Sequence, residues 1–205
     1  MRARTTAPLL LATLALLASC GPLVQIGGND APPAMLLTLR ATATPVTTAP
    51  VAKPVTVMVL PPAATGALQT LRLPVTVGDV ELQYLVGATW SEQPNRLFRR
   101  VLADTIVARG LIVIDPRGPS PRADMTLSGT LADFGLDVRN PADPHVSVRY
   151  DAVLNSSTGT LIAARRFEAS APAPGKSPTV VGTALNDAAN RVAGDVATWV
   201  LQVKQ

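Results

Sequence analysis

The sequence has very few of the residues on which most catalytic and metal-binding sites depend. Its 205 residues include one cysteine, Cys20, and one histidine, His145. A single cysteine excludes an intramolecular disulfide, so the chain must fold without covalent cross-links. His145 has no cysteine, glutamate or histidine at ligand spacing, which argues against a zinc site. We therefore expect no metal and no cofactor.

Aromatic and charged residues are also scarce. Aromatic residues make up 3% of the chain while apolar residues make up 47%, so the core must be built mainly from aliphatic side chains. The formal net charge of +4 includes Arg2 and Arg4, and the remaining surplus is spread along the chain. A nucleic-acid-binding protein would concentrate basic residues. The acidic residues are scattered without pairing, so we expect no enzyme.

The first nineteen residues have the composition of an export signal. Arg2 and Arg4 precede an apolar run from Leu9 to Ala18. A basic start, a short apolar stretch and small residues before a cleavage point are typical of a secretory signal peptide. The apolar run is about half the length of the roughly 20 residues that span a bilayer. We therefore predict export.

The end of this segment matches a bacterial lipobox. In Leu17-Ala18-Ser19-Cys20, cleavage between Ser19 and Cys20 would leave an acylated cysteine at the new N-terminus, with palmitate among the expected acyl groups. The alternative is an ordinary signal peptide with a cysteine there by chance. Gly21 follows the cysteine where an aspartate would favour retention at the inner membrane. The sequence thus predicts a lipid anchor on the periplasmic face of the outer membrane.

Composition divides the chain into three parts. Residues 1–19 form the predicted signal peptide. Residues 20–54 form a lipidated tether rich in proline, threonine and alanine, interrupted by a short strand at 35–40. Residues 55–205 form one domain.

Alternating apolar residues predict several strands in this domain. Segments 71–77 and 80–86 are expected to form a hairpin around a two-residue turn, Gly78-Asp79. Because Pro74 cannot donate a ladder hydrogen bond, its strand should lie at a sheet edge or carry a bulge. Within residues 125–138 the alternation shifts by one residue, which predicts a bulge near Ala132-Asp133. Segments 146–154 and 161–168 form a second expected hairpin.

Two helices complete the predicted fold. Apolar residues recur every three or four positions over 91–109, where Ser91 can cap the helix and Gly110 can end it, and over 178–203. Arginines 96, 99 and 100 of the first helix fit either a solvated face or a contact with lipid head groups. We predict an α+β fold in which a mostly antiparallel sheet of about seven strands carries both helices on one face.

A family resemblance rests on residues that are distributed through the domain. They are Arg72-Leu73-Pro74-Val75, Leu82-x-Tyr84, Trp90, Leu97-x-x-x-Val101-Leu102, Leu127-Ser128-Gly129-x-Leu131 with Phe134, Val146-x-Val148-x-Tyr150-Asp151-Ala152 and Trp199. Together with the lipobox, this pattern resembles the ABC-type transport auxiliary lipoproteins, the lipoprotein subunits of MCE-type and paraquat-inducible-type lipid transport systems.

The resemblance implies a non-enzymatic role in moving lipid between two membranes. The expected partners are an MCE-domain protein and separate permease and ATPase subunits of an ABC transporter, and the chain could also form a homo-oligomer. Trp90 is a candidate partner contact, although the interpretation of this residue as a core anchor is favoured. The alternative function is a structural or assembly-factor lipoprotein of the envelope with an unrelated partner.

Overall fold

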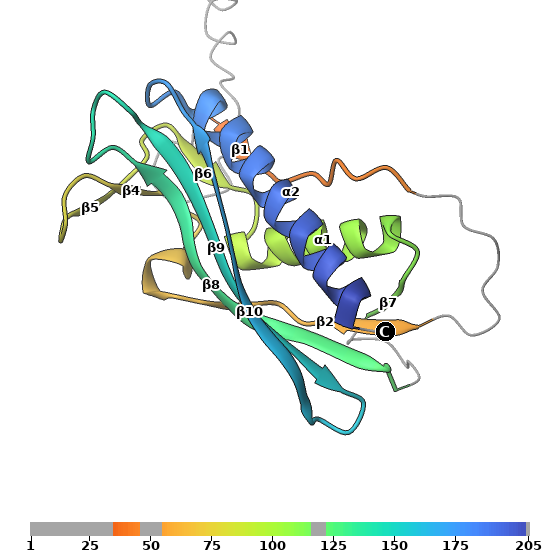
Figure 1. The fold of residues 1–205 in the computed structure, drawn as a ribbon. Helices are drawn as coiled ribbons and strands as arrows, with labels where there is room; N and C mark the ends of the chain where they lie inside the picture. Colours follow the sequence, from red (N-terminus) through yellow and green to blue (C-terminus); the bar gives the residue numbers. More distant parts are fainter. Residues whose placement is uncertain (1–34, 46–54, 116–121, 204–205) are drawn as a thin grey trace, which may run out of the picture. The chain divides into compact units, whose positions relative to one another are not determined.

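The computed structural model describes residues 35–45, 55–115 and 122–203 (Figure 1). This part of the chain contains ten strands, two α-helices and one short 3-10 helix. In chain order they are β1 (Met35–Leu37), β2 (Thr56–Val59), β3 (Ala63–Ala64), η1 (Gly66–Leu68), β4 (Pro74–Thr76), β5 (Leu82–Tyr84), β6 (Ala88–Trp90), α1 (Pro94–Ala108), β7 (Ile112–Ile114), β8 (Met125–Asp137), β9 (His145–Ser156), β10 (Leu161–Pro172) and α2 (Pro178–Val203).

The eight-stranded sheet is organised around β8, which has neighbours on both of its edges. Along one edge it pairs with β9 in antiparallel register over its whole length. Along the other edge three short strands follow one another: Val57 of β2 pairs with Met125, Ala63 of β3 with Thr130, and Val75 of β4 with Leu136. Beyond them, β10 pairs with β9, β7 with β2, and β5 with β4. One strand therefore connects all parts of the sheet.

The prediction of a mostly antiparallel sheet is wrong, because the sheet is mixed. The pairs β8–β9, β9–β10 and β4–β5 are antiparallel. The short strands β2, β3 and β4 run parallel to β8, and β2 is also parallel to β7. The connection from β2 to β7 runs through β3–β6 and then α1, and a long connection of this kind can join parallel strands. The α+β class and the two helices are as predicted.

The predicted bulge is confirmed. The register between β8 and β9 shifts between Leu131 and Asp133, which leaves Ala132 as the extra residue. Three residues before the bulge, Gly129 allows β9 to approach β8 closely. A Cβ atom at this position would lie 2.1 Å from the carbonyl oxygen of Asp151. A backbone atom cannot move away as a flexible side chain can. Gly129 is therefore required by the pairing itself.

The prediction that the strand of Pro74 lies at a sheet edge or carries a bulge is wrong. The strand that contains it lies between β5 and β8 and is not at an edge. Pro74 is the first residue of β4, and the pairing with β8 begins one residue later, at Val75. The first residue of a strand needs no ladder hydrogen bond from its nitrogen, so a proline is tolerated there.

The hairpin β4–β5 forms as predicted, but its turn is longer. Thr76 pairs with Leu82, so residues 77–81 make the connection instead of Gly78-Asp79 alone. Two hydrogen bonds close this loop, from the backbone N–H groups of Val77 and Gly78 to the carbonyl of Glu81. Val80 within this loop and Val86 after β5 are almost fully exposed, so these two apolar residues do not face the core.

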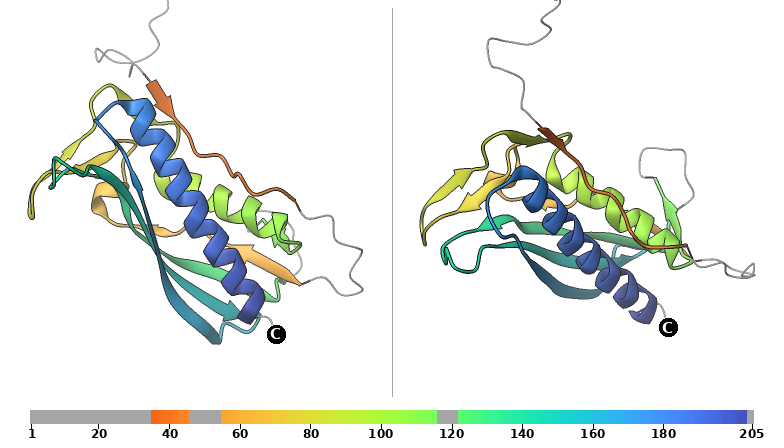
Figure 2. Two further views of the ribbon diagram at one scale, coloured as in Figure 1. Left: turned by 45° about the horizontal axis from the view of Figure 1, so that its top comes forward. Right: turned by 90° about the horizontal axis from the view of Figure 1, so that it is seen from above.

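Both helices pack on one face of the sheet (Figures 1 and 2). Six of the seven aromatic residues form three pairs. Two pairs join a helix to the sheet, and the third joins β6 to β8. Their ring centroids lie 5.4 Å apart for Trp90 and Phe134, 5.4 Å for Phe98 and Tyr150, and 5.5 Å for Phe167 and Trp199. Aliphatic side chains fill the rest of the core, as the composition predicts.

Helix α1 begins three residues later than predicted. Its N-cap is Gln93 rather than Ser91, and Pro94 occupies the first helical turn, where its missing N–H has no intrahelical partner in any case. Its last residue is Ala108, close to the predicted stop at Gly110. Helix α2 has the predicted bounds.

The compact unit that contains the sheet spans Pro33–Gln205 and includes β1. That strand, which the sequence analysis assigns to the tether, pairs in parallel with β6, and Leu37 and Leu39 are buried. Of the helices in the described ranges, neither is both long enough and apolar enough to span a membrane.

We predict that Gly129→Ala lowers the free energy of unfolding by about 2–3 kcal/mol, because the new Cβ clashes with the backbone of β9. The control is Gly194→Ala in α2, where a Cβ meets nothing within 4 Å. This control should be neutral or gain up to about 1 kcal/mol from higher helix propensity. Chemical denaturation measures both, and equal stability of the two variants would contradict the assigned register.

Candidate functional site

The face of β8, β9 and β10 that carries no helix is a broad polar surface, called the helix-free face below. Along β9, the residues Val146, Val148, Tyr150, Ala152 and Leu154 alternate into the core under the helices. The residues between them, from Ser147 to Asn155, point to the opposite side. Helices α1 and α2 both lie on the other side of the strands, so neither covers this face (Figure 2).

Charges of opposite sign face one another across these strands. Arg149 of β9 pairs in register with Asp133 of β8 on one side and with Glu168 of β10 on the other. In the next outward row, the Nε atom of Arg166 donates to Asp151 at 2.6 Å. The side chains of Arg166 and Asp151 are 60% and 38% exposed, so this pair contributes little to stability. Their effect is a patterned surface in which neighbouring strands present alternating charge.

A shallow hollow of about 250 Å³ lies at the centre of this face, beside the bulge. Its lining includes Asp133, Ser147, Arg149, Glu168 and Ser170. Ser147 donates a hydrogen bond to the Asp133 carboxylate. The Nε atom of Arg149 is buried and makes no hydrogen bond within the protein. The hollow therefore holds both charge signs and one N–H group without a protein acceptor.

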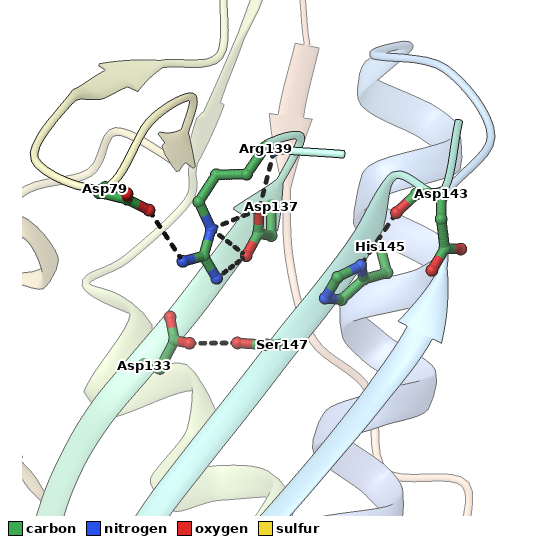
Figure 3. A network of polar contacts seen from close by, with 7 residues as sticks. All are labelled: Asp79, Asp133, Asp137, Arg139, Asp143, His145 and Ser147. Carbon is green, nitrogen blue, oxygen red and sulfur yellow. Dashed lines mark hydrogen bonds and ion pairs between the residues drawn. The ribbon is translucent and has the colours of Figure 1, made fainter. Parts of the chain in front are cut away.

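A network of polar contacts continues from the hollow to the end of the β8–β9 hairpin (Figure 3). Arg139 donates to both carboxylate oxygens of Asp137: its Nε atom lies 3.1 Å from Oδ1 and 3.0 Å from Oδ2, and its Nη2 atom lies 2.6 Å from Oδ2. The same guanidinium lies 3.8 Å from Asp79 in the β4–β5 loop. Next to it, the Nδ1 atom of His145 lies 3.0 Å from the carbonyl oxygen of Asp143. The network links the β4–β5 hairpin to β8.

Asp137 is the acidic group whose ionisation this network controls. The hydrogen bond from Arg139 holds the pKa of the Asp137 carboxyl below its ordinary value. Its side chain is 15% exposed, while that of Arg139 is 53% exposed. A charge-assisted fork between these groups favours the ionised carboxylate in the folded state.

On the opposite side of the molecule, residues 35–42 run along α2 and form what we call the strap (Figure 2). Asn186 accepts a hydrogen bond from the backbone N–H of Arg40, and Asn190 accepts one from Thr42, both at 2.8 Å. Asn190 also donates to the carbonyl of Arg40 at 2.8 Å. The two asparagines are one helical turn apart, so they hold two points of the strap from the same face of α2.

Two grooves follow the strap. One of about 280 Å³ lies between residues 35–40 and the start of α2. The other, of about 750 Å³, extends between α2 and the end of β10, with Thr42 and Arg191 in its lining. Arg191 donates to the carbonyl of Ser170 and so connects α2 to β10. Both grooves are open and lined mostly by short side chains.

The site residues predicted from the sequence fall in different places. Ser19 and Cys20, the cleavage and lipid-attachment positions, lie outside the described residues. Trp90 is fully buried against Phe134, so its side chain offers no surface to a partner in this conformation. Within the described ranges, no group of three or more histidine, cysteine, aspartate or glutamate side chains could hold a metal ion.

The three arginines of α1 belong to the protein's own contacts. Arg96 and Arg100 both pair with Glu92, at 4.0 Å and 2.5 Å. Arg99 donates to the carbonyl of Val59 at 2.9 Å and lies 3.9 Å from Asp115. These contacts favour the interpretation as an ordinary helix face over a binding surface for head groups.

Sequence reasoning missed both the charge rows and the strap. The residues of the rows are far apart in sequence and meet only through the register of three strands. The strap had one available signal, the pair Asn186 and Asn190 with helical spacing, but nothing in the sequence identified residues 40 and 42 as their partners.

Comparison with known structures identifies the architecture. The crystal structure of protein XCC0632 from Xanthomonas campestris, of the DUF330 family, superposes with a TM-score of 0.73 at 21% identity and covers 84% of this chain and 97% of that one. A second crystal structure, of an uncharacterized protein, gives a TM-score of 0.63 at 14% identity and covers 80% and 97%. Both show a shared fold only. A search of the curated proteins finds no match.

The fold thus defines an α+β protein in which one mixed sheet carries two helices on a single face. The sequence matches a model of the ABC-type transport auxiliary lipoprotein component family over residues 37–197. The chain belongs to this family, which confirms the predicted resemblance. Its members are lipoprotein components that accompany ABC-type transport systems.

We predict that Asn190→Ala loosens the strap. The change removes one acceptor and one donor, which should lower the free energy of unfolding by about 1–2 kcal/mol. Hydrogen exchange should become faster at the amide of Thr42 in particular. The control is Thr183→Ala, an exposed position on the same helix, which should change stability by less than about 0.5 kcal/mol. Unchanged exchange at Thr42 would contradict the role of Asn190.

We also predict that Asp137 makes stability depend on pH. Its pKa is lowered on folding, so its contribution is fully present above the unfolded value of about 3.9 and is lost as the pH falls through the lower folded value. The difference in melting temperature between wild type and Asp137→Asn should be largest near neutral pH and shrink below about pH 4. Thr183→Ala, which removes no ionisable group, is the control and should show no such trend. A constant difference for Asp137→Asn would refute the prediction.

Proposed function

We propose that this protein is a periplasmic lipoprotein, anchored to the outer membrane through Cys20, that serves as the auxiliary subunit of an ABC/MCE-type lipid transport system. The observation that carries the proposal is the family match over residues 37–197, which covers most of the chain. The predicted lipobox at Leu17–Cys20 supports the anchor, and Gly21 supports the outer membrane as its location.

The role we propose is docking rather than catalysis. The described surface has a wide polar face with charge rows, and the groove of about 750 Å³ between α2 and β10 is open and lined mostly by short side chains. A polar patch with patterned charge is suited to recognition of another protein, because complementary charge sets the orientation of the encounter. The partners we propose are the MCE-domain protein and, through it, the permease and ATPase subunits.

We propose the helix-free face as the surface that docks the MCE-domain protein. One row alternates in sign across the three strands (Asp133, Arg149 and Glu168), and the next row joins Asp151 of β9 to Arg166 of β10. A partner strand or loop of complementary pattern would match these two rows in one register. The unpartnered Nε–H of Arg149 could then find its acceptor on the partner. The opposite face is occupied by the protein's own helices and strap.

The test is affinity purification of the full, membrane-processed chain from cells, followed by identification of co-purifying subunits. We expect an MCE-domain protein in the wild-type sample. Arg166→Glu reverses a charge on the helix-free face and should reduce its recovery at least fivefold. The control is Arg165→Glu. The side chain of Arg165 lies on the other side of β10, over the ring of Phe167, so reversing its charge should leave recovery nearly unchanged.

The anchor is tested separately with Cys20→Ala. This variant should lose acylation, as measured by mass spectrometry, and should no longer fractionate with processed membrane protein. Recovery of an unrelated envelope protein instead of an MCE-domain protein, together with an intact lipid barrier after deletion of the gene, would favour the structural or assembly role.

A further inference from the structure

Strand β10 forms one edge of the eight-stranded sheet. Within the described residues it pairs with β9 alone, so no strand lies along its other side, which we call the open edge. The strand is 12 residues long, against about five or six in a typical strand, and most of its residues are exposed. A long exposed edge is a template for pairing with another chain.

Two hydrogen bonds show which residues of β10 turn their backbone groups toward the open edge. The N–H of Ala173, just after the strand, donates to the carbonyl of Pro144, just before β9, at 2.9 Å. The carbonyl of Ser170 instead accepts a hydrogen bond from Arg191 of α2. Successive residues of a strand point their backbone groups to opposite edges. Odd-numbered residues therefore bond to β9, and even-numbered residues face the open edge.

Two charges of opposite sign lie near the middle of the open edge. Arg166 and Glu168 are both even-numbered, so their backbone groups face outward and their side chains share the helix-free face. These side chains are 60% and 58% exposed, and Nε of Arg166 lies 3.8 Å from Oε1 of Glu168. Arg166 also donates to Asp151 of β9 through Nε and Nη2. A guanidinium has five N–H donors, so others remain for a further carboxylate.

Antiparallel pairing with β10 of a second copy makes these charges complementary in one register. A two-fold axis at Phe167 places Arg166 opposite Glu168 of the second copy, and Glu168 opposite its Arg166. Both residues face outward, so each pair can exchange two backbone hydrogen bonds. Moving the axis by one residue places Arg166 opposite Arg166, or Glu168 opposite Glu168. Like charges directly opposite are destabilising, so the charges select the register centred on Phe167.

Charged residues on an edge strand can also serve to prevent pairing. A row of one sign would do so in every register, whereas Arg166 and Glu168 repel only in the registers centred on themselves. The remaining charge of the strand, Arg165, has its guanidinium 5.1 Å from the centroid of the Phe167 ring, on the other face of β10. In the register centred on Phe167 it lies opposite Ala169 and meets no like charge.

We propose that the open edge of β10 binds the same edge of a second copy of this chain, in antiparallel register around Phe167. The two sheets then become one continuous sheet. Because Arg166 and Glu168 of both copies lie on one side of it, the two helix-free faces form a single surface. The occupant is a second copy because the complementary charges belong to the same strand. This inference does not depend on the proposed transport partners.

The test uses the full chain, purified after membrane processing and kept in an excess of detergent micelles. Sedimentation velocity measures the protein mass over a range of concentrations, and we expect the wild type to form a dimer. Arg166→Glu and Glu168→Arg each leave only like charges opposite one another. Each variant should therefore weaken the dimer by about tenfold. Melting temperatures of the variants show whether they fold.

Combining the two substitutions separates charge pairing from damage to the fold. An equimolar mixture of the single variants restores opposite charges at both pairs, so it should form the dimer that each variant forms poorly alone. The double variant Arg166→Glu/Glu168→Arg should dimerise like the wild type. The control is Arg165→Glu, whose side chain lies on the other face of β10 and should leave dimerisation unchanged.

Hydrogen exchange tests the backbone pairing itself. In the wild type, the amides of Arg166 and Glu168 should exchange about tenfold more slowly in the dimer than in the monomer produced by dilution. The amide of Phe167 faces β9 and should be equally protected in both. A wild type that is monomeric at every concentration, or an assembly that the charge variants leave unaltered, would overturn the proposal. A dimer without protection at Arg166 and Glu168 would exclude pairing through β10.

Discussion

The pairing of β8 on both of its edges is the constraint on which the rest of the structure depends. Its long antiparallel ladder with β9 fixes one half of the sheet, and three short parallel strands occupy its other edge one after another. None of those short strands is long enough to be stable by itself. Each is held because β8 already presents a fixed row of donors and acceptors, and because the helices cover the resulting sheet.

The scarcity of aromatic residues makes their placement informative. Six of the seven form three ring contacts between layers. The seventh, Tyr84, lies under the guanidinium of Arg72 on the surface. Large rings contribute more burial per residue than aliphatic side chains, so a few of them can fix the angle between layers. The aliphatic residues then fill the space that these contacts define.

The sequence was sufficient to predict elements whose pattern is local. Helix α2, the hairpin β9–β10 and the bulge at Ala132 follow from periodicity and from a phase change within one strand. The direction of pairing was not predictable, because alternation is the same in parallel and antiparallel strands. The position of the Pro74 strand was not predictable, because a proline costs a ladder hydrogen bond inside a strand but not at its first residue. The charge rows of the helix-free face depend on register between three strands, which no single segment encodes.

The strap has a mechanical consequence. It runs in the same direction as α2, with Met35 near Thr179, Arg40 at Asn186 and Thr42 at Asn190. A force directed along the strap therefore loads these contacts at the same time, in shear, instead of breaking them one by one as in peeling. Bonds loaded together share the force, so the attachment resists tension better than its individual hydrogen bonds would suggest. A chain that is pulled from its N-terminal end would load the pairing of β1 with β6 and the contacts between the strap and α2 together.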